Sequence, residues 1–328
     1  MRPSNLLVTL SNIGDVILTT PVIAVMSARF PDSELTVVSG PKAAPLLAGS
    51  RLIHELIIYD KHADLGGQIR FLRKLRRKSY EWAVDLRNTA IPFLVKARRR
   101  SPLFRPAGEI LKRSRHLEIL KRSGFEISGA SAFDFFSPEE ERNLFSKLRA
   151  GGLKEDAGWV VASPVAASAL KSWPLSKFRE VLSGLLRERS EPIVLAGDER
   201  EGRLISNLAE LAPQRIFNLA GKTTLRELAA LVARASLVLA NDSAVMHLGY
   251  ELDRPVAAIF GPTSHEKYGR TGSYFKVIRR GVECSPCEKA VCLFDRQSCF
   301  EDLDSQAVLK ACLELLKPSA VSGGLHAR

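Results

Sequence analysis

Short apolar runs rich in β-branched residues alternate with longer helical runs along this chain, and the alternation occurs twice. Strands that are apolar throughout are typical of a parallel sheet with helices on both faces. The strands predicted in the first half are Asn5–Leu10, Leu35–Ser39, Leu56–Tyr59 and Trp82–Asp85. The helices predicted there are Asp15–Arg29, which Pro21 should kink, Lys42–Ala48, Leu65–Lys78, Thr89–Arg98 and Glu109–Ser123.

The alternation of predicted strands and helices begins again in the second half, after a segment at 138–150 and the pair Gly151-Gly152. Its predicted strands are Trp159–Ser163, Pro192–Ala196, Leu237–Ala240 and Val256–Phe260. Its predicted helices are Ser176–Arg189 with Ser176 at the N-cap, Arg200–Leu211, a helix opened by the capping box Thr224–Glu227, Ser243–Leu252 and Ser305–Leu316. We therefore expect two doubly wound α/β domains, residues 1–151 and 152–318, followed by a disordered tail at 319–328.

The chain carries a formal net charge of +12, and its basic residues are unevenly spread. Between Arg70 and Arg122 there are 17 Lys and Arg against 4 Asp and Glu, while the remainder is close to neutral. A local basic surface indicates an anionic partner, such as nucleic acid, a phosphorylated glycolipid or an anionic membrane leaflet, although solvated helix faces would give the same pattern.

No signal peptide and no apolar stretch of membrane-spanning length is visible in the sequence. We therefore expect the protein in the cytoplasm, where it could touch the inner membrane peripherally from the cytoplasmic side.

Several polar segments directly follow predicted strands, where open α/β sheets bind ligands. Asn12-Ile13-Gly14-Asp15 follows the first strand, and a helix cap is the alternative explanation for Asp15. No GxGxxG accompanies it, so a nicotinamide or flavin site is not supported. Asn241-Asp242-Ser243 follows a strand of the second half and opens a helix that also carries His247, an arrangement that favours a phosphate.

Two further turns could line the same site. Lys171-Ser172-Trp173-Pro174 offers a positive charge for a diphosphate on a loop that Trp173 should anchor, and Gly261-Pro262-Thr263 follows the strand ending at Phe260.

Four of the five cysteines lie within sixteen residues, at Cys284, Cys287, Cys292 and Cys299. Four thiolates can satisfy a tetrahedral zinc or iron site, which would be structural because no coordination position would be open. Free thiols are the alternative, since the spacing is not that of a zinc finger and the cytosol disfavours disulfides.

These segments occur in a fixed order. Asn12-x-Gly14-Asp15 with Thr20-Pro21 is followed by Lys171-x-Trp173-Pro174, Asn241-Asp242-Ser243-x-x-Met246-His247 and Phe260-Gly261-Pro262-Thr263. Together they resemble the lipopolysaccharide heptosyltransferases of glycosyltransferase family 9, over nearly the whole chain. The resemblance implies a GT-B fold, with two facing Rossmann-like domains: an acceptor-side N-terminal domain and a nucleotide-sugar-binding C-terminal domain.

The resemblance also implies an inverting transfer of heptose from ADP-heptose to an acidic, lipid-linked lipopolysaccharide-core acceptor, with no cofactor or metal required for catalysis. In it Asp15 matches the catalytic base, and Asn12, Gly14, Gly261 and Thr263 belong to positioning turns. The residues implied to bind the donor diphosphate and nucleotide are Lys171, Asp198, Glu199, Asp242, Ser243, Ala244, Met246 and His247.

Other readings stay open at this point. Another GT-B transferase could use a different nucleotide sugar or a protein acceptor. A non-catalytic protein could hold a metal at the four cysteines and nucleic acid on the basic stretch. No stacking-aromatic pattern accompanies the basic residues, so we do not expect nucleic acid as a partner.

Overall fold

The computed structural model describes residues 3–103, 111–127, 132–154 and 158–317. The chain divides into two compact units. The first is Met1–Glu141 with Thr224–Ala230 and Glu266–Tyr268, and the second is Arg142–Thr223, Leu231–His265 and Gly269–Arg328. Within the described ranges, no helix combines the length and hydropathy needed to cross a bilayer.

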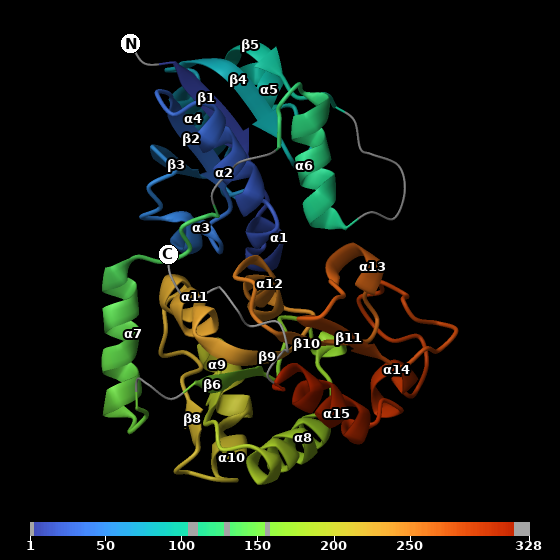
Figure 1. The fold of residues 1–328 in the computed structure, drawn as a ribbon. Coiled ribbons are helices and arrows are strands. Elements are labelled where there is room, and N and C mark those ends of the chain that lie inside the picture. Colours follow the sequence, from blue (N-terminus) through green and yellow to red (C-terminus); the bar gives the residue numbers. More distant parts are fainter. Residues whose placement is uncertain (1–2, 104–110, 128–131, 155–157, 318–328) are drawn as a thin grey trace. The chain divides into compact units, whose positions relative to one another are not determined.

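The first unit is built on a five-stranded parallel sheet with the strand order β3-β2-β1-β4-β5 (Figure 1). Its strands are β1 (Ser4–Val8), β2 (Glu34–Ser39), β3 (Glu55–Ile58), β4 (Ser79–Asp85) and β5 (Lys96–Arg100). Its helices are α1 (Ile13–Ile17), α2 (Thr20–Arg29), α3 (Ala44–Leu47), α4 (Leu65–Leu75), α5 (Ile91–Leu94) and α6 (Lys112–Arg122). A core that includes Leu6, Val8, Val38 and Ala83 packs against the sheet.

The second unit holds a six-stranded parallel sheet with the order β11-β10-β9-β6-β7-β8. Its strands are β6 (Trp159–Ser163), β7 (Ile193–Leu195), β8 (Ile216–Asn218), β9 (Ala235–Asn241), β10 (Val256–Phe260) and β11 (Phe275–Arg279). The remaining helices of the chain are α7 (Pro138–Ala150), the 3-10 turn η1 (Ala169–Lys171), α8 (Leu175–Glu188), α9 (Glu199–Leu204), α10 (Ser206–Ala209), α11 (Leu225–Ala233), α12 (Ala244–Glu251), α13 (His265–Tyr268), α14 (Ser298–Glu301) and α15 (Ser305–Leu315).

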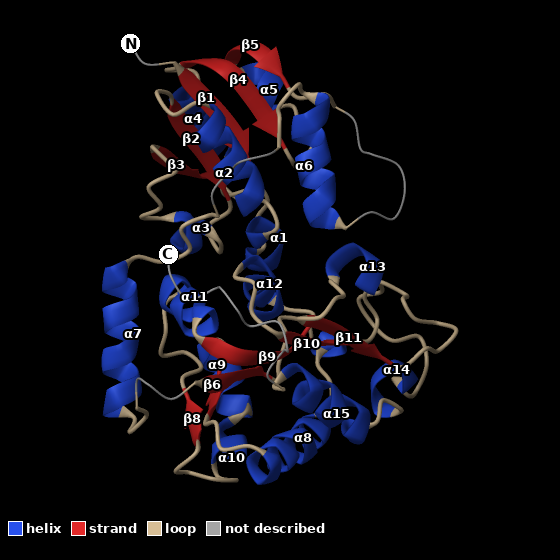
Figure 2. Cartoon of the chain, viewed as in Figure 1, coloured by secondary structure: helices blue, strands red, loops and turns tan. Residues whose placement is uncertain are grey.

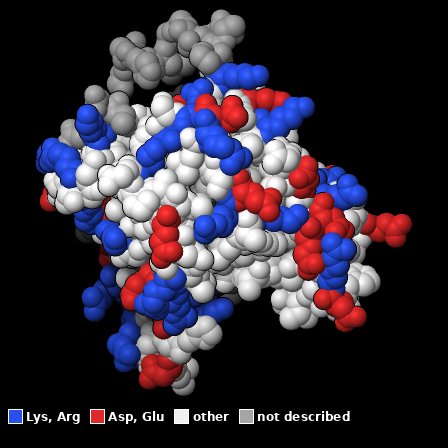
Figure 3. Space-filling view, turned by 90° about the horizontal axis from the view of Figure 1, so that it is seen from below, with Lys and Arg blue, Asp and Glu red and all other residues white. Residues whose placement is uncertain are grey.

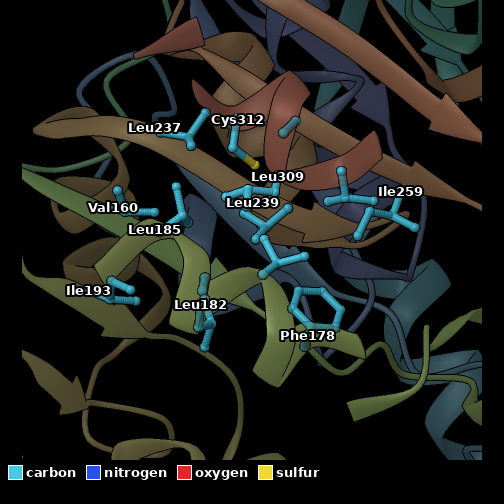
Figure 4. Packing of buried hydrophobic residues seen from close by; sticks show 14 of the residues in the cluster. Val160, Phe178, Leu182, Leu185, Ile193, Leu237, Leu239, Ile259, Leu309 and Cys312 are labelled. Carbon is cyan, nitrogen blue, oxygen red and sulfur yellow. The ribbon is translucent and has the colours of Figure 1, made fainter. Parts of the chain in front are cut away.

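Helices alternate with strands along both sheets (Figure 2). In the second unit, side chains of α8, β9 and α15 meet in one apolar cluster that includes Phe178, Leu239 and Leu309 (Figure 4). These apolar layers confirm the predicted class, two parallel-sheet α/β domains.

Several boundaries differ from the prediction. The expected long helix Asp15–Arg29 is two helices, because the chain breaks before Thr20 and Pro21 lies in the first turn of α2. Ser176 is not the N-cap of α8: Pro174 holds that position, and its fixed φ of −53° suits a helix start. The capping box at Thr224 is present, since Thr224 and Glu227 exchange hydrogen bonds of 2.8 and 3.1 Å.

The prediction of a helix over Thr89–Arg98 is wrong in its second part, because Lys96–Arg100 forms β5 at the edge of the sheet. Strands β8 and β11, at the two edges of the second sheet, were also not predicted. Edge strands are partly solvated, so they do not need the apolar run that marks a central strand. The predicted disordered tail lies outside the described residues.

Arg226, near the start of α11, is buried within the first unit at 4% exposure. Its Nε donates to Glu140 Oε1 at 2.7 Å, and its Nη1 donates to the carbonyl oxygens of Leu46 and Asp134. Burial alone would raise the pKa of Glu140, but hydrogen bonds from Ser137 and Arg226 lower it overall. The ion pair therefore fixes the start of α11 to the first turn of α7, and the two carbonyl contacts join it to α3 and to the segment before α7.

Candidate functional site

The order of the strands fixes where a ligand can bind in each unit. In each sheet, consecutive strands are first added on one side of the first strand and then on its other side. This reversal of strand order lies between β1 and β4 in the first sheet and between β6 and β9 in the second. Crevices outside the carboxyl ends of such strands are the binding sites of doubly wound folds. The polar segments singled out in the sequence follow β1, β6 and β9, so they lie at these two switch points.

At the switch point of the second unit, Lys171 and Asp242 form an ion pair. Lys171 ends the 3-10 turn after β6, Asp242 follows β9, and Nζ lies 2.9 Å from Oδ2. Asp242 is almost fully buried, whereas the Lys171 side chain is one-third exposed. His247 of α12 places Nε2 3.8 Å from the other oxygen of Asp242. The structure thus brings Lys171 together with Asp242 and His247, although Lys171 and Asp242 are 71 positions apart in the sequence.

Asn241 holds the Lys171 loop in place. Its buried side chain accepts a hydrogen bond from the backbone N–H of Trp173 at 3.1 Å and donates to the carbonyl oxygen of Pro164 at 2.7 Å. Trp173 is itself buried, and its indole N–H donates to the carbonyl oxygen of Phe300 at 3.1 Å. The expected anchoring role of Trp173 is confirmed, and Asn241 is a positioning residue that joins the ends of β6 and β9.

Three buried hydroxyl groups follow β9 and β10. The Oγ atoms of Ser243 and Ser264 and the Oγ1 atom of Thr263 have no hydrogen-bond partner among the described residues. Unpaired buried hydroxyls are costly, and they can donate to an oxyanion. Ser243 is also the N-cap of α12, where backbone N–H groups are free to meet an anion, and its side chain makes no capping bond. This set favours a phosphate ligand.

The turn after β10 is held by close packing. A side chain at Gly261 would collide with the ring of Phe300, whose nearest atoms lie 2.6 Å from an added Cβ. The Ser285 hydroxyl donates to the carbonyl oxygen of Gly261 at 2.6 Å, and the backbone N–H of Cys287 donates to that of Pro262. Gly261 thus serves packing, and Thr263 beside it carries the unpaired hydroxyl.

Other predicted donor-binding residues have structural contacts of their own. Asp198 caps α9, and it exchanges hydrogen bonds of 2.8 and 2.7 Å with Glu201. Glu199 is exposed and pairs with Arg203 on the same helix. Met246 is fully buried in the packing of α12, while Ala244 begins that helix and is half-buried. These contacts explain Asp198 and Met246 without a ligand.

Asp15 lies in α1, directly after β1. Asn12 is the N-cap of this helix, and its amide donates to Asp15 Oδ2 at 3.1 Å. The ammonium group of Lys112, from α6, lies 3.8 Å from Oδ1 and 4.7 Å from the centre of the Tyr268 ring. Gly14 lies between Asn12 and Asp15 in the first turn. The carboxylate is one-quarter exposed, so it can meet both a cation and a ligand.

Besides Lys112, α6 places His116 near Asp15. It is buried at 4% exposure, and neither ring nitrogen has a partner among the described residues. Burial lowers its pKa to about 4, with Lys112 and Arg115 adding to the decrease and Asp15 opposing it. His116 is therefore neutral at pH 7. Lys112 and His116 were not predicted: their spacing puts them on one helix face, but sequence cannot show that the face meets Asp15.

The four clustered cysteines share one neighbourhood without forming a ligand cage. Burial raises the pKa of Cys299, and the thiols of Cys284, Cys287 and Cys292 add to the increase. All four are free thiols that range from exposed at Cys284 to buried at Cys299. In the described part of the chain, no group of three or more His, Cys, Asp or Glu side chains could hold a metal ion. The expectation of a structural zinc or iron at these cysteines therefore finds no support.

A match to a protein-family model identifies the family of this chain. The model of glycosyltransferase family 9 (heptosyltransferase) matches residues 112–297, more than half of the chain. The chain belongs to glycosyltransferase family 9. It is a glycosyltransferase, and the family predicted from the ordered motifs is confirmed.

Several heptosyltransferases are similar over most of the chain. Lipopolysaccharide heptosyltransferase 3 of Escherichia coli K12 is 28% identical over 77% of this chain and 80% of its own length. The solved structure of E. coli ADP-heptose heptosyltransferase II aligns with a TM-score of 0.74 at 20% identity, covering 96% of this chain and 98% of that one. E. coli heptosyltransferase WaaC, solved with ADP-2-deoxy-2-fluoro heptose, gives 0.70 at 19% identity, covering 94% and 98%. These structures support the GT-B fold.

For a family 9 transferase, the two switch points offer different chemistry. The second unit offers a lysine, an N-cap and hydroxyl donors, which suit a diphosphate. The first unit offers a carboxylate next to a cation, which suits removal of a proton from a hydroxyl group. Ser264 is the residue with an unpaired hydroxyl in this group that the sequence did not single out, although it directly follows Thr263.

Proposed function

We propose that the protein transfers heptose from ADP-heptose to an acidic, lipid-linked saccharide of the lipopolysaccharide core. The observation that carries the proposal is the Lys171–Asp242 pair beside three unpaired buried hydroxyls, at the switch point of the second sheet. Relatives and a structural neighbour named as heptosyltransferases, one of them holding an ADP-heptose analogue, support the choice of donor.

In this proposal the donor diphosphate lies against Lys171 and the start of α12. Lys171 neutralises the phosphate charge, and Ser243, Thr263, Ser264 and the backbone N–H groups at Ala244 donate hydrogen bonds. His247 and Asp242 hold the lysine and the nucleotide sugar, while Met246 packs behind them. Asp198 and Glu199, after β7, face the nucleotide. Residues 152–318 form the donor domain, and residues 1–151 form the acceptor domain.

Transfer is a single displacement that inverts the anomeric centre. The acceptor hydroxyl oxygen attacks C1 of the heptose, the bond between C1 and the diphosphate oxygen breaks, and ADP departs with the electron pair. Asp15 takes the proton of the acceptor hydroxyl, oriented by Asn12 and by the turn at Gly14. Positive charge that develops on the sugar also favours a carboxylate. In this mechanism the chain's own cation and hydrogen-bond donors stabilise the leaving group, so no metal takes part.

The lipid-linked acceptor also implies where the enzyme works. We propose that it acts at the cytoplasmic face of the inner membrane, as a peripheral protein.

A nucleotide panel tests the donor. We expect ADP and ADP-heptose to raise the melting temperature and UDP and GDP to leave it unchanged. Lys171→Met should weaken ADP binding about tenfold, as expected for the loss of one charge-assisted contact. Lys310→Met, an exposed lysine of α15, is the matched control. Stabilisation by UDP- or GDP-sugars alone would contradict the proposed donor, and loss of turnover in EDTA would contradict a metal-free transfer.

A further inference from the structure

The first unit exposes two adjacent large apolar side chains beside β5. Phe93 and Leu94 of α5 are 54% and 44% exposed, whereas Ile91 and Val95 on either side of them are buried. The helix thus uses one face for the core and presents two adjacent apolar side chains to solvent. Scattered single apolar residues on a surface are common, but adjacent large ones beside concentrated charge are typical of binding surfaces.

Basic side chains surround these two residues. Between residues 86 and 103 the chain has five Lys or Arg and no Asp or Glu. Side chains alternate along a strand, so Lys96, Arg98 and Arg100 of β5 share one face. Arg98 is 73% exposed, and its carboxylate neighbour is Glu81, at 3.5 Å on β4. The face therefore keeps an excess of positive charge.

Arg100 joins the charged strand to the apolar helix. Its Nε donates to the carbonyl oxygen of Pro92 at 2.8 Å, and its Nη2 donates to that of Val95 at 3.4 Å. Its guanidinium carbon lies 5.9 Å from the centre of the Phe93 ring. These contacts fix α5 against β5, so the exposed Phe93 ring lies beside the strand face that carries Lys96, Arg98 and Arg100, with the exposed Leu94 next to it in the chain. The surface is therefore formed before any partner binds.

We propose that this surface, named the α5–β5 surface and comprising Phe93, Leu94, Lys96, Arg98 and Arg100, docks on an anionic lipid bilayer. Apolar side chains at the level of the headgroups and a row of basic residues over anionic lipid are the two contributions that bind peripheral proteins to membranes. A solvated helix face would explain the charges but not the exposed Phe93 and Leu94. The inference rests on the proposed function only in that a lipid-linked acceptor has to be reached at a bilayer.

The second unit offers an apolar surface for comparison. Val291, Leu293 and Phe294 are 67%, 74% and 62% exposed. The segment 288–296 that contains them has two basic and two acidic residues, so it carries no net charge. Figure 3 shows a face of the molecule on which basic and acidic side chains are likewise interspersed. The combination of apolar exposure with an excess of one charge sign distinguishes the α5–β5 surface from this segment of the second unit.

Co-sedimentation of the full chain with vesicles tests the proposal without donor or acceptor, so it can fail independently of the transferase activity. We expect binding to vesicles of equal parts phosphatidylcholine and phosphatidylglycerol, little binding to pure phosphatidylcholine, and weaker binding at high salt. The double variant Phe93→Ser with Leu94→Ser should bind on the order of tenfold more weakly. The double variant Lys96→Gln with Arg98→Gln should lose on the order of tenfold or more, since each basic residue contributes about fivefold.

The matched control is Leu293→Ser with Phe294→Ser, which removes the same two side-chain types from the uncharged segment, where they are more exposed, and should leave vesicle binding unchanged. Melting temperatures of all three double variants confirm that each is folded. Equal binding of the wild type and the Phe93, Leu94 variant would overturn the proposal, as would an equal loss in the control. A dimer that disperses in the Phe93, Leu94 variant without any vesicle binding would assign the surface to self-association instead. RNA binding that depends on Lys96 and Arg98 but not on Phe93 would assign it to nucleic acid.

Discussion

The two switch points are built in different ways. In the second unit the polar groups are fixed by a buried frame, in which Asn241 and Trp173 hold the Lys171 loop through hydrogen bonds of 2.7–3.1 Å. In the first unit Asp15 lies on a five-residue helix, and its partners are an amide at 3.1 Å and an ammonium group at 3.8 Å. The buried frame of the second unit suits a ligand that has to be held in one position. The arrangement around Asp15 in the first unit suits a group that must exchange a proton, because its contacts are few and adjustable.

The largest expected effect is on kcat, through the loss of proton transfer to Asp15. Asp15→Asn keeps the shape of the side chain but cannot accept a proton, so we expect kcat to fall about 10³-fold. ADP affinity should stay unchanged, because the groups proposed to bind the donor lie in the other unit. Asp32→Asn, at an exposed loop position, is the control. Steady-state kinetics and calorimetry measure the two effects, and a fully active Asp15→Asn enzyme would reduce Asp15 to a helix residue.

The next largest effect is on the pH dependence of stability, and it arises from His116 beside Asp15 in the first unit. The unfolded imidazole takes up its proton near pH 6.5 but the folded one only near pH 4. Between these values the unfolded chain binds more protons, so the free energy of unfolding should fall as the pH is lowered and level off below about pH 4.

The full shift corresponds to about 3 kcal/mol, and the stabilisation is complete above about pH 6.5. His116→Leu should flatten this part of the stability profile, as measured by denaturant unfolding from pH 7 to pH 4. An unchanged pH profile would show that His116 is not the group that titrates.

A third test breaks the frame of the second unit. Asn241→Ala leaves the N–H of Trp173 and the carbonyl oxygen of Pro164 without partners, so we expect a loss of about 2 kcal/mol in stability. It should also raise KM for the donor, because Lys171 is no longer held. Asn218→Ala, which removes a similar pair of bonds at β8, should lower stability without changing KM. Equal changes in KM would show that the frame does not position Lys171.

The smallest expected effect separates ligand binding from stability. Ser264→Ala removes a buried hydroxyl that has no partner in the described chain, so the free protein should be unchanged or up to about 1 kcal/mol more stable. ADP should bind several-fold more weakly. Thr36→Val removes an equally buried unpaired hydroxyl from β2 and should leave ADP affinity alone. Unchanged ADP binding in Ser264→Ala would exclude this hydroxyl as a ligand group.

Sequence predicted the central parts of both sheets because central strands must be apolar. Leu6–Val8 and Val256–Phe260 are buried throughout, and their pattern admits few alternatives. The same rule failed at β5, whose arginines stay in water at the sheet edge. Asp15, Lys171 and Asp242 could be singled out because strand ends are identifiable in the sequence. The partners Lys112 and His116 could not, because nothing local in α6 records which element its buried face meets.

The arginine-rich strand β5 has a second consequence, for the behaviour of the protein at high concentration. Among the described residues it is the last strand of its sheet, so no described strand pairs with one row of its backbone N–H and C=O groups. Closely spaced positive charges repel the matching edge of a second molecule, and so they discourage the growth of intermolecular sheets. Neutralising all of its basic residues at once would therefore be expected to reduce solubility even where the fold itself remains intact.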